Sequence, residues 1–265
     1  MPTPFMHLDF AEHSQLLPAL NPAIRELLQA HYSAFYLGNV APDYQTICDI
    51  PREETHFYNI PPAPGLQAHE LMLERFPQLA DVSRLPEAQA VFLAGYCAHL
   101  IQDLVWYRRI LYPLFVQSKK WPQDRRQRFV AHSTLLTYLD RRACRALPLD
   151  AGKILAGAVS SNWLPFAADE DLHRWRDMLA NQFHPGNSTE TIAIYARRLG
   201  MAPAQFAANL DDPEWMDRQV FAEAPLAQID AILAAGNDKS VQFINRFLDP
   251  VVTAPLTTVA QNTCV

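Results

Sequence analysis

Glycine is scarce in this sequence, and the cysteines lack the spacing of a common metal or redox motif. Eight glycines stand against twenty-one prolines in 265 residues, so glycine-rich turns are few, and strand-type alternation is scarce as well. These shortages argue against a β-rich fold. None of the cysteines belongs to a C-x-x-C pair, and the one inside an apolar run, Cys97, is interpreted as a small core residue. The four are Cys48, Cys97, Cys144 and Cys264.

A long basic run is also missing. The net charge is −6. The densest basic stretch consists of Arg125, Arg126 and Arg128, followed by Arg141, Arg142 and Arg145. We interpret these arginines as the exposed faces of one helix, the usual explanation of a charge run. The sequence therefore gives no support to binding of nucleic acid through a basic surface.

Targeting segments and several well-known catalytic motifs are absent too. Residues 1–14 contain no basic segment followed by an apolar one, so a secretory signal is not expected. With the cysteine usage, this predicts a protein of the reducing cytoplasm. The sequence has no G-x-S-x-G, no glycine-rich phosphate loop and no H-E-x-x-H, so any catalysis must rest on other residues.

The composition that remains is that of a globular protein. Hydrophobic residues make up 49% of the chain and charged residues 19%. A chain of this length buries a large core without disulfides or metals. A metal site here is therefore expected to serve function rather than to hold the fold together.

The proline positions and the apolar periodicity predict an all-α multi-helix bundle. Asn21-Pro22 and Asp212-Pro213 each place a capping side chain before a proline at the first helical position. The stretch 50–65 is predicted to be a proline-rich loop. With no repeat or linker, one domain over residues 1–265 is the simplest prediction, and the oligomeric state stays open. The predicted helices are 22–35, 66–76, 86–118, 123–146, 150–159, 168–182, 188–199, 203–209, 213–222, 226–235 and 239–248.

The most informative helix carries two polar residues in an apolar surrounding. The stretch 90–107 is apolar on all sides apart from His99, Gln102 and Asp103, which predicts a buried helix. It is not a membrane span, because a histidine and an acid interrupt it short of the roughly 18 apolar residues that a span needs. His99 and Asp103 share one face of the helix. They either bind a metal or satisfy each other as a buried hydrogen-bonded pair.

Other residues favour the metal site over the structural pair. Gly38 is expected to end the preceding helix in a left-handed turn, and Pro42 to fix the approach of the chain to Asp43. His56 follows in the proline-rich loop, and His7 lies among apolar neighbours near the start. Taken singly, each has an ordinary explanation: Asp43 as a helix cap, His56 as a loop residue, His7 as part of a half-buried terminus.

In this order, the residues resemble a known family. His7, the G-N-V-A-P-D that ends at Asp43, the T-H-F at His56 and the G-Y-C-A-H-L-I-Q-D of 95–103 together resemble the zinc-dependent phospholipase C family, which is related to the P1-type nucleases. The resemblance implies an all-α bundle with up to three zinc ions at the bottom of a cleft. It also implies hydrolysis of phosphate esters, which the family cleaves in phospholipids or nucleic acids. For this chain we expect a lipid or small-molecule phosphate ester and no nucleic acid.

The resemblance also implies a role for each residue. Asp43, His56, His99 and Asp103 match the ligands of one metal ion, with Asp103 bridging to a second. His7 stands in for a ligand that secreted members take from their N-terminus. Asp43 is in addition the candidate base for the attacking water. One or two zinc ions are expected, although nitrogen and carboxylate ligands also suit iron or manganese.

The third metal site of the family is expected to be degraded. Arg109 stands where secreted members carry a histidine, six residues after the helix aspartate. His132 is the candidate for a later ligand, but Leu136, four residues on, has no donor atom. Arg109, or its neighbour Arg108, is a candidate to offset the charge of a phosphate where that metal is missing.

Three functions therefore compete. The first is a metal-dependent phosphoesterase that uses metal-activated water. The second is a repurposed metalloenzyme, for example an iron enzyme, that acts on a small metabolite without hydrolysing phosphate. The third is a helical binding protein in which the pair of His99 and Asp103 is structural.

Overall fold

The computed structural model describes residues 1–119, 125–184 and 190–253, and helices make up its regular structure. No strand occurs in these described ranges, which confirms the predicted all-α class. Cys264 and the predicted helix starts at 123 and 188 lie outside them. The α-helices are α1 Pro4–Leu16, α2 Pro22–Ala30, α3 Tyr32–Val40, α4 Arg52–His56, α5 Ala68–Arg75, α6 Glu87–Trp106, α7 Arg125–Ala146, α8 Ala151–Ala156, α9 Asp169–Asn181, α10 Thr191–Leu199, α11 Pro203–Asp211, α12 Pro213–Met216 and α13 Leu226–Thr253.

Shorter helical segments of other types join these elements. In the described part of the chain, three have 3-10 geometry and two have π geometry. The 3-10 segment η1 follows α3 directly, and the π segment η4 follows α6 directly, so each extends the helix before it. They are η1 Ala41–Thr46, η2 Pro77–Leu79, η3 Val82–Arg84, η4 Tyr107–Val116 and η5 Asp217–Phe221.

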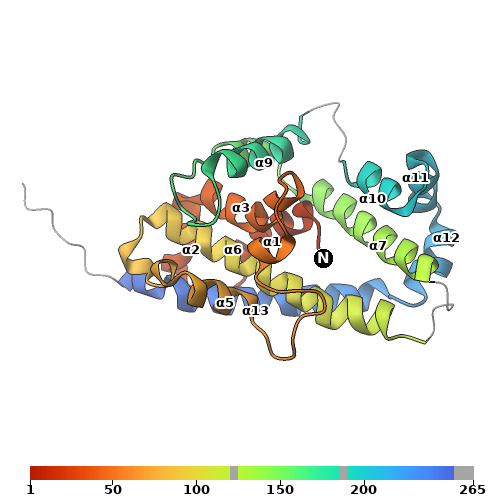
Figure 1. Cartoon of the computed structure of the whole chain (residues 1–265), viewed down its shortest axis with the longest axis horizontal. Coiled ribbons are helices and arrows are strands. Elements are labelled where there is room, and N and C mark those ends of the chain that lie inside the picture. The colour runs from red at the N-terminus through yellow and green to blue at the C-terminus, as the bar shows by residue number, and fades with distance from the viewer. Residues whose placement is uncertain (120–124, 185–189, 254–265) are drawn as a thin grey trace, which may run out of the picture.

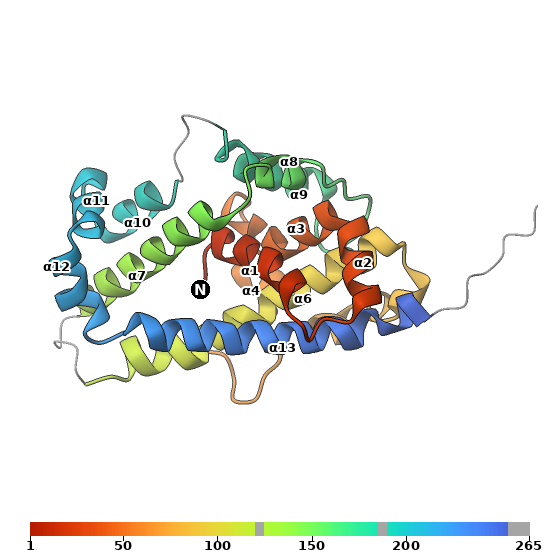
Figure 2. The same ribbon diagram turned by 180° about the vertical axis from the view of Figure 1, so that it is seen from behind.

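Helix α6 lies at the centre of the bundle. It packs most extensively against α3 and α13, and α13 runs along the length of the molecule in both views (Figures 1 and 2). Helices α8 and α9 lie over the α3 side, whereas α7 and α10 to α12 gather at one end (Figure 1). As the sequence predicts, α6 is buried almost all round, and Cys97 within it is fully buried.

Two glycines let α3 and α6 touch along their backbones. A Cβ at Gly38 would collide with the carbonyl oxygen of Phe92, and a Cβ at Gly95 would lie 2.7 Å from that of Phe35. The prediction that Gly38 ends its helix in a left-handed turn is wrong. Gly38 lies inside α3, and its φ is not positive. The glycine is needed for close helix packing instead, and this contact sets α3 against the face of α6 that carries His99.

Several predicted boundaries differ from the observed ones. The predicted helix 22–35 is two helices, α2 and α3, and the predicted pair 226–235 and 239–248 is the single helix α13. Asn21 and Asp212 do cap α2 and α12, since each side chain accepts a backbone N–H bond. The region 4–16, for which no helix is predicted, forms α1.

The remaining features agree with a globular bundle. The buried apolar residues form one cluster that reaches from α1 to α13. Arg141 and Arg142 make surface ion pairs with Asp211 and Asp230. Within the described ranges, no helix has both the length and the apolar character to cross a membrane. The single domain over 1–265 stays a prediction.

Candidate metal centre

Four elements bring five of the predicted ligands together. His7 comes from α1, Asp43 from η1, His56 from the end of α4, and His99 and Asp103 from α6. Helix α6 supplies two of them because residues four apart share one face. Three of the side chains, His7, His56 and His99, and the Asp103 carboxylate are fully buried, whereas the Asp43 side chain is 17% exposed. The centre is therefore deep, with its open side at Asp43.

The distances fit a shared cation better than direct hydrogen bonds. His56 Nε2 lies 3.5 Å from an oxygen of Asp43 and 3.5 Å from Asp103 Oδ2. His99 Nε2 lies 3.9 Å from the same Oδ2, and His7 Nε2 lies 3.7 Å from Asp103 Oδ1. These separations are too long for good hydrogen bonds. Ligands at about 2 Å from one tetrahedral zinc ion are about 3.3 Å apart, so a small inward shift would complete the coordination.

The donor atoms that face each other have no other partner. Nε2 of His7, His56 and His99 and Oδ1 of Asp103 are buried and make no hydrogen bond. Leaving several such atoms unpaired in a folded protein is costly, so their convergence indicates a ligand. Two groups satisfy the geometry of a metal site: Asp43, His56 and His99, and His7, His99 and Asp103. The residues present therefore fit zinc.

Neighbouring groups set the orientation of the rings. Nδ1 of His99 donates to the carbonyl oxygen of Asn39 at 2.8 Å, which leaves the lone pair on Nε2 facing the cluster. Nδ1 of His56 contacts the Thr55 hydroxyl at 2.8 Å. The His7 ring stacks on the His99 ring with centroids 3.7 Å apart. This stacking holds both rings at the metal-facing side of α6.

The electrostatics favour the protonation states that metal ligands need. Burial, followed by the neighbouring His7 ring, lowers the pKa of His99 to about 3. Burial alone would raise the pKa of Asp43, but contacts with the His56 and His99 rings outweigh it and lower the pKa to about 2. For Asp103, burial is likewise outweighed by His7, His99 and Arg52, so its pKa falls well below the usual value. At neutral pH, His99 is neutral and both carboxyls are ionised.

An arginine that sequence reasoning missed also belongs to this centre. Arg52 Nη2 donates to Asp103 Oδ2 at 2.5 Å and to the Tyr58 hydroxyl at 2.9 Å. The Tyr58 hydroxyl donates to the same oxygen at 3.3 Å, and the guanidinium lies 4.7 Å from the centroid of the Tyr58 ring. A signal existed: Arg52 stands four residues before His56, so both lie on one face of α4.

The structure places two other predicted site residues elsewhere. Arg109 is exposed in η4 and lines a surface hollow with Gln228 and Ile232 of α13. His132 on α7 accepts a hydrogen bond on Nε2 from the Trp106 indole at 3.1 Å, so that nitrogen is engaged. Neither residue belongs to a group with metal-site geometry in the described chain. Arg108 also points away and donates to the Leu66 carbonyl oxygen at 2.5 Å.

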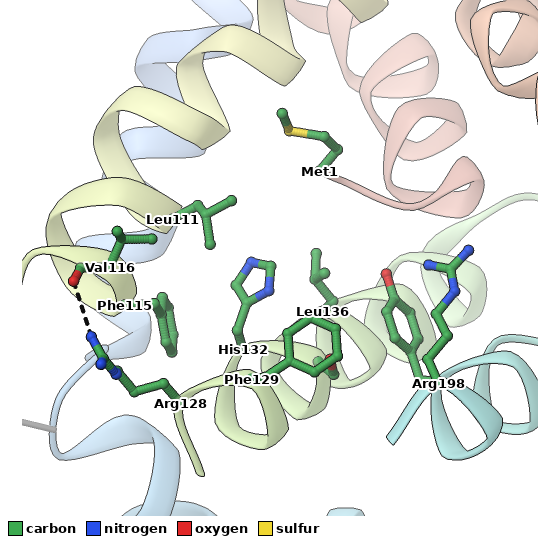
Figure 3. Close-up of a pocket in the computed structure, with 11 residues that line it drawn as sticks. Met1, Leu111, Phe115, Val116, Arg128, Phe129, His132, Leu136 and Arg198 are labelled. Carbon is green, nitrogen blue, oxygen red and sulfur yellow. Dashed lines mark hydrogen bonds between the residues drawn. The ribbon is translucent and has the colours of Figure 1, made fainter. Parts of the chain in front are cut away.

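His132 instead forms part of the wall of an apolar cavity of about 610 Å³. Figure 3 shows its ring pointing into the space below Met1, with apolar side chains on both sides. None of the five clustered residues lines this cavity, but Met1 does. Burial lowers the pKa of the Met1 amino group, and the charges of Asp103 and Asp43 oppose this, so the cavity lies near the clustered carboxylates. The lining residues are Met1, Leu111, Phe115, Val116, Arg128, Phe129, His132, Ser133, Leu136, Tyr195 and Arg198.

Fold and site together define an α-helical protein with a cluster of buried histidines and carboxylates that fits a metal ion. The comparison with family models agrees, since the family described as zinc dependent phospholipase C matches residues 6–183. The chain belongs to the zinc-dependent phospholipase C family, which confirms the resemblance seen in the sequence. The match includes the region of all five clustered ligands. No curated protein and no solved structure matched the chain.

Proposed function

We propose that this protein hydrolyses a phosphate ester with zinc held by Asp43, His56, His99 and Asp103. The observation that carries the proposal is the convergence of buried, unpartnered atoms of His56, His99 and Asp103 beside the partly exposed carboxylate of Asp43. Membership of the zinc-dependent phospholipase C family supports both the metal and the reaction class. Zinc at such a site polarises a phosphoryl oxygen and lowers the pKa of bound water to about 7.

Asp43 is the residue best placed to accept the proton of the attacking water. It is the most exposed of the clustered ligands, and its carboxyl stays ionised because its pKa is about 2. A base needs hydrogen-bond reach to the water that it activates, and the open side of the centre is where water enters. His99, fixed by the Asn39 carbonyl, keeps the metal-facing geometry during this step.

The apolar cavity beside the centre supports a lipid-like substrate. Its volume lies in the range that ligand pockets occupy. Leu111, Phe115, Phe129 and Leu136 supply an apolar lining, and Arg198 stands at its edge (Figure 3). A phosphate ester bound at the metal would place an apolar leaving group in this cavity. We therefore propose an ester of an apolar alcohol, such as a phospholipid, as the substrate.

The test compares metal forms and substrates. We expect the zinc form to cleave a nitrophenyl phosphodiester slowly, since the predicted third metal site is degraded, and a short-chain phospholipid faster. A chelator should abolish both activities, and zinc should restore them. The proposal fails if zinc, manganese and iron forms all leave phosphomonoesters and phosphodiesters intact. Oxygen uptake by the iron form with a small organic substrate would then favour the repurposed metalloenzyme.

A substitution in the cavity wall tests the substrate class. Leu136→Gln adds a polar group to the lining without touching a proposed metal ligand. We expect it to raise KM for the phospholipid and to leave cleavage of the nitrophenyl diester unchanged. An equal loss with both substrates would contradict the role of this cavity.

A further inference from the structure

Arg52 is the one guanidinium within reach of the clustered carboxylates among the described ion pairs. It reaches Asp103 Oδ2 from α4, and its other terminal nitrogen, Nη1, is buried without a partner. The ring of Tyr58 lies below the guanidinium, and the Tyr58 hydroxyl bonds to both Arg52 and Asp103. The arginine is therefore held in place from two sides.

The charges around the centre limit how many metal ions it accommodates. Asp43 and Asp103 carry two negative charges when ionised, and Arg52 carries one positive charge. One zinc ion brings the sum to one positive charge, whereas two ions would leave three positive charges in a buried site. Uncompensated buried charge is strongly unfavourable. The family resemblance implies a second ion between His7 and Asp103, and Asp103 Oδ1, which faces His7, has no partner. Arg52 binds the other oxygen, Oδ2, so it disfavours a second ion through its positive charge and not by occupying the ligand atom.

We propose that Arg52 takes the place of a second metal ion. The centre then holds one zinc ion, at Asp43, His56, His99 and Asp103, and Arg52 uses its free Nη1 to bind a phosphoryl oxygen of the substrate. Arginine suits this task because its planar group donates to a carboxylate and a phosphate at the same time. His7 is then a positioning residue: its ring stacks on His99, and its Nε2 faces Asp103 Oδ1.

The metal content of Arg52 variants directly tests whether Arg52 takes the place of a second metal ion. We expect the full-length wild-type protein, dialysed against excess zinc and then against buffer, to retain one zinc ion per chain. Arg52→Gln should retain two, because the competing positive charge is gone, and Arg52→Lys should retain one, because the charge is kept. In the double variant Arg52→Gln with His7→Ala, the content should return to one. His7→Ala alone should stay at one.

Binding of inorganic phosphate gives a second readout. In the one-zinc forms, we expect Arg52→Lys to bind phosphate within a few-fold of wild type. Arg52→Gln, loaded with a single equivalent of zinc, should bind it about tenfold or more weakly, as the loss of a charge-assisted bond predicts. Near-ultraviolet circular dichroism checks that each variant keeps its tertiary packing.

Two outcomes would overturn the proposal. The first is a wild-type protein that retains two zinc ions, because Arg52 would then not replace the second ion. An Arg52→Gln variant that is folded yet retains one ion and binds phosphate normally gives Arg52 no part in either task. The phosphate-binding half of the proposal rests on the proposed function, but metal counting does not. If wild type retains one ion and Arg52→Gln retains two, but neither cleaves an ester, the proposed phosphoesterase function is wrong. The replacement of the second ion by Arg52 would still hold.

Discussion

At the scale of single residues, the sequence predicts which histidines and carboxylates cluster better than it predicts their surroundings. His99 and Asp103 are predictable because a fixed spacing on a buried helix puts them on one face. His7 and Asp43 needed the family resemblance, since their elements meet α6 only through tertiary packing. The sequence does not point to Arg52, because the proline-rich stretch 50–65 predicts a loop. The structure contains the short helix α4 there, and this helix places Arg52 beside His56.

Replacement of a central ligand separates the metal from the fold. We expect His99→Ala to lose zinc and activity and to keep most of the helical circular dichroism signal, because the core extends far beyond this residue. Metal analysis and a thermal melt of the metal-free variant measure both effects. The control is His31→Ala, which removes a histidine that pairs with Glu87 at the other end of α6. If the His99→Ala variant is unfolded, the metal site is needed for folding and the prediction is wrong.

A second buried carboxyl links stability to pH. Asp140 on α7 is fully buried; Thr191 donates to its Oδ2 at 2.6 Å, and Oδ1 has no partner. Burial raises the pKa of Asp140 to about 6, although hydrogen bonds oppose the rise. Since the folded pKa is above the unfolded value of 3.8, the protonated form stabilises the fold. This contribution is present below pH 3.8 and is lost as pH rises through about 6.

The expected size follows from the shift. About two pKa units correspond to about 3 kcal/mol of unfolding free energy, lost between roughly pH 4 and 7. Asp140→Asn keeps an acceptor for Thr191 and removes the titration. Urea unfolding of both proteins at several pH values isolates the effect as a difference. Identical pH profiles would show that Asp140 titrates normally.

At the scale of elements, the continuation of α6 shows where α-helical spacing no longer predicts which way a side chain points. From Tyr107 onward the helix adopts π geometry, in which the hydrogen bond spans five residues rather than four. Each π turn holds extra backbone, so side chains after Tyr107 point in directions that an α-helical count from Asp103 does not give. Arg109 therefore lies on the exposed face beside α13 and not at the centre. The signal of an irregular helix in this segment is Pro113, which has no backbone N–H for an α-helical bond.

The crossing of α3 and α6 is the element contact on which the centre depends. A Cβ at position 95 would meet backbone atoms of α3, which cannot move aside as a flexible side chain does. We expect Gly95→Ala to lower the unfolding free energy by about 1–3 kcal/mol and to weaken zinc binding, since Asn39 would shift away from His99. Equilibrium unfolding and a zinc titration measure the two losses.

Another glycine on a neighbouring contact provides the control. Gly236 on α13 faces α6, but there an added Cβ would meet only a methyl group of Val105, at 3.3 Å. Gly236→Ala should therefore leave zinc affinity unchanged. Equal zinc losses in both variants would mean that tight helix packing in general, and not the α3 contact, sets the centre.

At the scale of the whole molecule, the all-α class and the family could both be predicted, but the assembly of the helices could not. Helices α2 and α3, predicted as one, and α13, predicted as two, show that propensity does not fix where a helix bends or continues. Helices α3 and α13 both pack extensively against α6, and such contacts between distant segments are not evident from the sequence. The place of α1 beside α7 and α3, which positions His7, likewise follows from long-range burial.

Removal of the metal tests whether the whole fold needs it. We expect the chelated protein to keep its helical signal and a cooperative melt, at a lower temperature than the zinc form. Bound zinc adds about 4 kcal/mol when its free concentration is a thousandfold above Kd, because it binds the folded chain alone. Differential scanning calorimetry with and without a chelator gives the shift. Collapse of the helical signal on chelation would contradict the prediction.

The uneven exposure of the ligands also sets how zinc leaves the protein. Solvent reaches the centre at Asp43, while the histidines that face it are fully buried. A chelator molecule cannot replace several buried ligands one after another, so an ion has to detach from them before it meets its acceptor in solution. The rate of zinc release should then be independent of chelator concentration once the chelator is in excess. A protein with a centre of this kind exchanges its metal at a pace set by its own opening, whatever competes for the ion outside.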